Sequence, residues 1–147
     1  MLPVKFVKVH PNARPPEYKT EGSAGMDLYA VEKICLYSED LPVAVNTGLK
    51  IQLPPGYEAQ IRSRSSLALV GVTVANSPGT LDCDFTGVVK VLLTYYDAGR
   101  ALGEFEIRPG DRIAQMVIAK YERAEFVEVE ALEETTRGEG GFGSTGK

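Results

Sequence analysis

In several short segments of this chain, apolar and polar residues alternate with a period of two, which is the spacing of strands with one buried face. The segments are rich in β-branched and aromatic residues, and glycine and proline separate them. The pattern predicts strands at residues 4–9, 25–30, 43–53, 57–62, 72–76, 88–96 and 112–121. A Pro-Pro-Gly sequence at 54–56 predicts a turn between two of them.

Residues 111–137 form the longest run without glycine or proline, and this run could hold either a helix or further strands. Because Val127, Val129 and Ala131 alternate with glutamates, we predict a strand there. One helical turn is predicted at 65–69, where Ser and Arg residues precede a short run of Leu and Ala.

The predicted fold class is all-β, a single sandwich or jelly roll with short connections, because the chain has no internal repeat and no linker. This domain is expected to span residues 1–136. The segment 138–147 contains five glycines and one aromatic residue, too little apolar area to fold by itself. We therefore expect residues 137–147 to form a flexible arm.

Composition narrows the function. A chain of 147 residues with 44% hydrophobic residues can form one core without disulfides, and its net charge of −4 argues against a nucleic-acid partner. Residues 1–11 lack the apolar run of a signal peptide, and no window could span a bilayer, so we expect a cytoplasmic protein without a membrane partner. Cys35 and Cys83 have no metal-site spacing and are expected to be free thiols.

The chemistry must operate almost without histidine, since His10 is the only one. A single histidine argues against a Ser-His-Asp triad and against a histidine-rich zinc site. If the protein is a hydrolase, its base is expected to be a carboxylate, with Arg, Lys or Mg2+ assisting the electrophile.

Two segments could bind phosphate. In the C-terminal tail, glycine backbone N–H groups, Arg137, Ser144 and Thr145 could surround phosphate oxygens, although a solvated terminus has the same composition. The sequence GFGSTGK at 141–147 is not a P-loop, because no Ser/Thr and no helix follow it. At 62–68, two arginines and three serines precede the helical turn, which suits an anion, although Arg and Ser before a helix are more often a cap and a solvated charge.

Three further features remain open from the residues alone. The turn-rich run 76–87 reads as a hairpin with an exposed backbone, or as a plain turn with Asp82 and Asp84 solvated. Gln115 interrupts an apolar stretch, and we expect it to be buried with a structural hydrogen bond. Asp27 is similarly ambiguous.

Taken in order, five segments resemble the motifs of the trimeric dUTPase family. They are AGMDLYA at 24–30, RSSLA at 64–68, GTLDCDFTG at 79–87, GDRIAQ at 110–115 and RGEGGFGSTG at 137–146. The resemblance implies a jelly-roll-like subunit, a homotrimer whose sites combine motifs from different subunits, and hydrolysis of dUTP to dUMP and pyrophosphate with Mg2+. Such an enzyme keeps uracil out of DNA and supplies dUMP for thymidylate synthesis.

The resemblance also assigns roles to individual residues. Asp82 would be the general base that activates water for attack on the α-phosphate. Phe85, where the family usually has Tyr, would exclude a 2′-hydroxyl. Mg2+ would be held mainly by the substrate phosphates, with Asp27 reaching it through water. Uracil would be read by the main chain of Gly79, Thr80 and Leu81 and by Asn76, and a low-ranked substrate contact would come from Lys90.

The phosphate contacts implied by the resemblance come from two parts of the chain. Arg64, Ser65, Ser66 and Gln115 would hold the phosphates, and closure of the tail would add Arg137, Phe142 stacked on uracil, Gly143, Ser144 and Thr145. Ser63 and Ser66 replace the usual Pro and Gly, Tyr95 stands where Asn is common, and the loop 97–103 is longer than usual.

Two rival functions stay open. A dCTP deaminase of the same superfamily shares the subunit fold but releases ammonia, and GTLDCDFTG favours the pyrophosphatase. A non-catalytic trimeric nucleotide-binding module would bind dUTP without releasing pyrophosphate. Retention of Asp82, Arg64 and Gln115 argues against that alternative.

Overall fold

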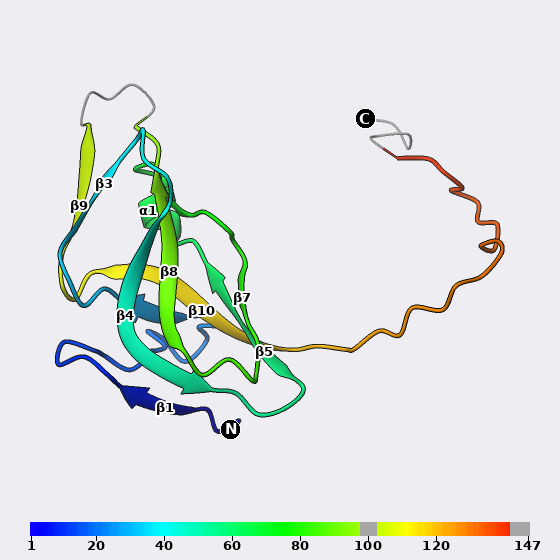
Figure 1. Cartoon of the computed structure of the whole chain (residues 1–147), viewed down its shortest axis with the longest axis horizontal. Helices are drawn as coiled ribbons and strands as arrows, with labels where there is room; N and C mark the ends of the chain where they lie inside the picture. Colours follow the sequence, from blue (N-terminus) through cyan, green and yellow to red (C-terminus); the bar gives the residue numbers. More distant parts are fainter. Residues whose placement is uncertain (98–102, 142–147) are drawn as a thin grey trace.

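The fold is built from antiparallel sheets (Figure 1). The computed structural model describes residues 1–97 and 103–141. One four-stranded sheet has the order β1 (Lys5–Lys8), β4 (Val43–Gln52), β8 (Val88–Tyr95) and β6 (Val72–Val74). The other has the order β2 (Met26–Tyr29), β10 (Arg112–Lys120), β5 (Tyr57–Arg62) and β7 (Gly79–Leu81). A small sheet pairs β3 (Ile34–Tyr37) with β9 (Glu104–Ile107), and the short helix α1 (Ser65–Ala68) follows β5.

All three sheets contribute aliphatic side chains to one core cluster. Burial of each such side chain contributes about 1.5–3 kcal/mol. The members of this core cluster include Val45, Val91 and Leu93 from the first sheet, Leu28, Ile61 and Met116 from the second, and Leu36 and Ile107 from the small sheet. The predicted all-β class is confirmed, and no helix in the described ranges is long and apolar enough to cross a membrane.

The seven strands predicted from alternation are confirmed, although some ends differ by one or two residues. β5 has the predicted bounds, and the turn at 54–56 places Gly56 at φ +83°, with the Tyr57 N–H donating to the Pro54 carbonyl over 3.3 Å. The predicted helical turn is α1. Cys35 and Cys83 are free thiols, as expected.

The strand predicted around 127–131 is wrong, because residues 121–130 are irregular. This segment runs away from the body of the protein and meets no sheet edge with which to pair (Figure 1). Phe126 is 98% exposed and Leu132 is 87% exposed. Strand periodicity without a partner in the same chain therefore produced no strand, since a strand needs a neighbour for its backbone hydrogen bonds.

The run 76–87 also differs from its prediction as a hairpin. β7 pairs with β5 rather than with β8, which belongs to the other four-stranded sheet. A turn in which the Phe85 N–H donates to the Asp82 carbonyl over 3.2 Å lies between the two strands. The run is therefore a crossover between sheets, with β7 at the edge of its own sheet.

A β-bulge in β10 determines which side chains face outward. The pairing of β10 with β2 shifts register between Arg112 and Ala114, so Ile113 and Ala114 are both buried while Arg112 and Gln115 are exposed. Bulges re-aim side chains in this way. The expectation that Gln115 is buried is therefore wrong.

Candidate active site

The cationic cluster, which we define as Asp27, Arg64 and Arg112, lies on the outer face of the second sheet. The Asp27 side chain is 3% exposed, and its Oδ2 accepts a hydrogen bond from Arg112 Nη1 over 3.1 Å. Its Oδ1 lies 3.3 Å from Arg64 Nε, without the alignment of a hydrogen bond. Arg64 Nη1 donates to the Arg112 carbonyl over 3.0 Å. One carboxylate thus holds two guanidinium groups, and the cluster keeps an excess of positive charge.

Gln115, Ser65 and Ser66, three other residues expected to bind phosphate, lie beside this cluster. Gln115 is the cross-strand neighbour of Asp27 in β2 and of Arg62 in β5, which places it on the same outer face. Gly25 allows the approach, because a Cβ there would lie 3.3 Å from Gln115 Cβ. Ser65 and Ser66 are exposed at the start of α1, directly after Arg64. The structure therefore brings the residues 64–66 close to Gln115 of β10, all of which the sequence analysis predicted to bind phosphate.

Asp82 lies in a different place, the carboxylate cavity. This cavity of about 520 Å3 follows the end of β7 and is lined by Glu58, Asp82, Cys83, Asp84, Tyr121 and Arg123. Asp82 is exposed, as a base that must meet water requires. Cys83 Sγ lies 3.6 Å from Tyr121 Oη, and this hydrogen bond raises the pKa of Tyr121 above its usual value.

β7 has one paired edge and one open edge. Gly79, Thr80 and Leu81 pair with β5 on one side, and β7 is the last strand in its sheet, so within the described ranges its other edge has no strand partner. Open strand edges carry backbone donors and acceptors that can pair with another molecule. The expected main-chain recognition of a base needs such an edge.

Two glycines allow close packing around this edge. A Cβ at Gly79 would lie 3.1 Å from Nδ2 of Asn76, so the amide expected to contact the base sits directly against β7. A Cβ at Gly87 would lie 2.6 Å from Cζ of Phe85, so the ring folds back over Gly87. Phe85 remains 42% exposed, which leaves the ring available to a ligand.

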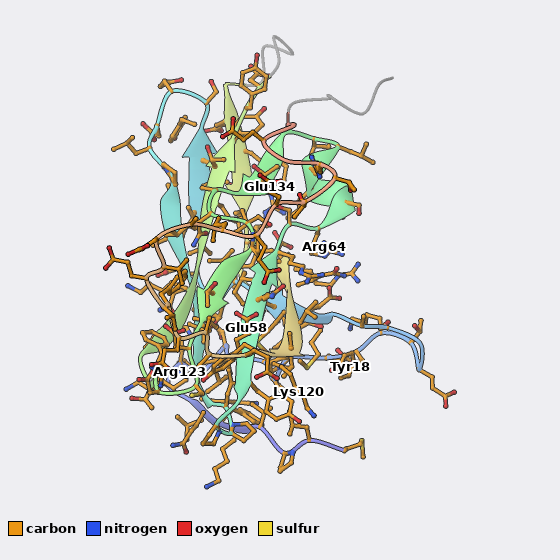
Figure 2. The ribbon with its side chains drawn as sticks, turned by 90° about the vertical axis from the view of Figure 1, so that its right-hand side faces the viewer. Tyr18, Glu58, Arg64, Lys120, Arg123 and Glu134 are labelled. Atoms are coloured by element: carbon orange, nitrogen blue, oxygen red, sulfur yellow. The ribbon has the colours of Figure 1, made fainter. Side chains whose placement is uncertain are left out.

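The cationic cluster and Asp82 do not meet within one chain. Leu81 pairs with Ala59, whereas Arg62 lies further along β5 and Arg64 beyond it. The strand between Ala59 and Arg62 alone spans about 10 Å. Figure 2 shows Arg64 apart from Glu58 and Arg123, and Arg64 lines a separate cavity of about 320 Å3 together with Arg112. Each chain therefore holds two separate groups of candidate site residues.

Two further predicted residues lie elsewhere. Lys90 is exposed in β8, opposite Asn46 of β4, in the other sheet. Arg137 is exposed in the C-terminal segment, where its Nε donates to the Gly140 carbonyl over 2.8 Å. The predictions for Phe142, Gly143, Ser144 and Thr145 lie outside the described residues.

Arg112 is a candidate site residue that the sequence analysis did not single out. It stands inside GDRIAQ, but alternation alone gives no reason to single it out, and its partner Asp27 is 85 residues away. The signal that could have found it is the motif itself, in which a charged residue precedes an apolar stretch close to Gln115.

Comparison with known proteins gives matches over most of the chain. A family model described as dUTPase matches residues 12–146. The deoxyuridine 5'-triphosphate nucleotidohydrolase of Helicobacter pylori strain Shi470 is 48% identical over 146 residues, covering 99% of this chain and 97% of that protein. The protein of the same name from Rickettsia bellii strain OSU 85-389 is 53% identical over 134 residues, covering 89% of this chain and 86% of that protein.

Solved structures match the fold as well. The structure of Staphylococcus bacteriophage 80alpha dUTPase with dUPNHPP aligns with a TM-score of 0.88 and 25% identity, covering 99% of both chains. A variant dUTPase of phage phi11 of S. aureus, described with a structural Mg(II) ion, aligns with a TM-score of 0.78 and 22% identity, covering 90% of this chain and 99% of that chain.

Proposed function

Because this chain belongs to the dUTPase family, we propose that it hydrolyses dUTP to dUMP and pyrophosphate, with Mg2+, at sites shared between copies in a homotrimer. The family match covers residues 12–146 and therefore includes all five motifs. The observation that carries the proposal is the placement of Asp82 in an exposed cavity beside an open strand edge, with a cationic cluster at the other end of β5.

In the proposed reaction, Asp82 takes a proton from a water molecule as the water attacks the α-phosphorus. The bond from the α-phosphorus to the oxygen that bridges it to the β-phosphorus breaks, and pyrophosphate leaves with that oxygen. A carboxylate suffices as base, because the charge that develops on the phosphates is stabilised by cations. Arg64, Ser65, Ser66 and Gln115 would supply these contacts, and Arg137, Phe142, Gly143, Ser144 and Thr145 would close over the substrate.

The residues present fit a hydrated Mg2+ held mainly by the phosphates. Within the described ranges there is no group of three or more His, Cys, Asp or Glu side chains that could hold a metal. Asp27 is the candidate, and its Oδ1 lacks an aligned hydrogen bond, so it can accept one from a metal-bound water. When bound, Mg2+ would neutralise part of the phosphate charge.

Selectivity for deoxyuridine would come from β7 and Phe85. The open edge of β7, with Asn76 packed against Gly79, offers fixed donors and acceptors, and cytosine would leave some of them unpaired. A methyl group at C5 would clash with the close backbone. The Phe85 ring over Gly87 would occupy the space of a 2′-hydroxyl.

A homotrimer would explain two features of the single chain. Asp82 and Arg64 line separate cavities, so a complete site needs the Asp82 end of one copy beside the Arg64 end of another. The C-terminal segment leaves its own body with Phe126, Val127 and Leu132 exposed, which suits contact with a neighbouring copy. We further propose that the enzyme acts in the cytoplasm, where it keeps uracil out of DNA and supplies dUMP.

The decisive experiment compares Asp82→Asn with its neighbour Asp84→Asn, since both carboxylates line one cavity and both are exposed. Loss of a general base is expected to reduce kcat for dUTP by about 10²–10⁴-fold with the Kd for dUTP little changed, whereas Asp84→Asn should keep most of its turnover. Equal kcat values for wild type and Asp82→Asn would remove Asp82 from the mechanism.

Assays with dUTP, UTP, dCTP and dTTP should release pyrophosphate from dUTP only. Release of ammonia from dCTP would indicate a deaminase. Tight binding of dUTP without turnover would indicate a binding module.

A further inference from the structure

A cavity of about 540 Å3 lies beside the cationic cluster, between the segment that follows Ala13 and the turn before β10. Its walls carry three cations and one carboxylate. The charged and aromatic residues that line it, with the glycine that shapes it, are Arg14, Glu17, Lys19, Tyr29, Gly110 and Arg112.

Arg14 is held in place without a carboxylate partner. Its guanidinium carbon lies 5.4 Å from the centroid of the Tyr29 ring, a cation–π contact that orients the group. Gly110, at φ +90°, lets the backbone approach, because a Cβ there would lie 3.2 Å from Arg14 Nη2. Across residues 1–97 and 103–141, Arg14 forms no ion pair.

The remaining charges leave the cavity positive. Lys19 and Glu17 neutralise each other over 2.6 Å, and hydrogen bonds from Lys19 and the Tyr29 hydroxyl hold the pKa of Glu17 below its usual value. Asp27 is the only carboxylate paired with Arg64 and Arg112 in the described part of the chain. With Lys19 and Glu17 cancelling, Arg14 and Arg112 remain as the positive charges that line the cavity, and Arg112 shares the Asp27 carboxylate with Arg64.

We propose that this cavity binds a condensed inorganic phosphate, and that its occupant is the pyrophosphate released from the substrate. The inference rests on the proposed function. Arg112 lines both this cavity and the one that contains Arg64, so one guanidinium group can contact the leaving group before and after it moves. Guanidinium groups match phosphate oxygens in geometry and bind them through charge-assisted hydrogen bonds.

The test is the affinity of the full chain for pyrophosphate, measured by calorimetry without nucleotide, with orthophosphate and sulfate for comparison. Arg14→Gln removes one charge and is expected to weaken pyrophosphate binding about ten-fold, the loss of one charge-assisted contact. Lys8→Gln, which removes an exposed charge on β1, should leave pyrophosphate binding unchanged. Orthophosphate should bind more weakly than pyrophosphate, since it spans fewer of the cations.

Steady-state kinetics separate this site from the substrate site. For Arg14→Gln, the Ki of pyrophosphate as a product inhibitor should rise far more than KM for dUTP. An unchanged pyrophosphate Kd in folded Arg14→Gln would overturn the proposal, and so would equal rises of Ki and KM. If Arg14→Gln lowers the Tm of the assembled oligomer but leaves pyrophosphate binding unchanged, the proposal is overturned, and Arg14 instead pairs with a carboxylate of a neighbouring copy. Failure of wild type to hydrolyse dUTP would refute the proposed function, whereas calorimetric binding tests the cavity independently.

Discussion

Mixing two inactive variants tests whether the site is shared between copies. Asp82→Asn removes the proposed base in the carboxylate cavity, and Arg64→Gln removes a cation at the other end of β5. Arg112 continues to neutralise Asp27 in the Arg64 variant, so the loss of stability should stay below about 3 kcal/mol, the lower end for breaking a lone buried pair. Each variant alone should have very low activity.

The recovery expected on mixing follows from where the two groups lie. A site is intact when its Asp82 comes from an Arg64→Gln copy and its Arg64 from an Asp82→Asn copy. For equal amounts unfolded together and reassembled at random, each condition holds for half of the sites, so about one quarter of wild-type activity should return. If one chain supplied both groups, no intact site could form.

The assay is pyrophosphate release from dUTP after joint refolding. Controls are each variant refolded alone, the two mixed without unfolding, and Tm values that confirm assembly. Activity of the refolded mixture equal to the average of the two variants would refute the shared site and would require both groups to reach one substrate within a chain.

Three further outcomes are expected. Gly87→Ala should push the Phe85 ring aside, since the new Cβ would lie 2.6 Å from Cζ of Phe85. The ratio of kcat/KM for dUTP to that for UTP should then fall about ten-fold. Gly22→Ala, whose new Cβ would have no atom within 4 Å, is the matched control, and an unchanged ratio in Gly87→Ala would show that Phe85 does not set the selectivity. Removal of residues 138–147 should reduce kcat about 10²-fold through lost closure while Tm stays constant, and full activity would remove the arm from the mechanism. Hydrogen bonds from Lys33 and Arg108 hold the pKa of Glu106 below its usual 4.5. The stabilisation of the fold by these hydrogen bonds is therefore present above pH 4.5 and is lost as pH falls through the lowered pKa. The Tm difference between wild type and Glu106→Gln should vanish in acid, and a difference that stays constant with pH would contradict this.

Alternation predicts strand bounds best where the strand has a regular inward face. β5 alternates buried Ala59 and Ile61 with more exposed neighbours and was predicted with its observed bounds. β3 and β9 were missed, and their pairing joins Ile34 to Ile107, which lie about half of the chain apart. Local pattern carries no information about such a partner.

The sequence predicts which residues form the candidate site better than it predicts how those residues are arranged. The motifs identified Asp82, Arg64 and Gln115, but the outward position of Gln115 depends on a bulge that periodicity cannot show. The role of Arg112 depends on Asp27, which approaches only after β2 and β10 pair. The assignments of catalytic and binding roles stay predictions until the variants are measured.

The three-residue length of β7 has a consequence for solubility as well as for recognition. An exposed edge is a template on which other polypeptides can polymerise, and long, flat edges promote aggregation. So short an edge offers few unpaired backbone groups to a foreign strand, and under the proposed function these groups would need to contact only one pyrimidine ring. A longer β7 would therefore raise the risk of association through this edge.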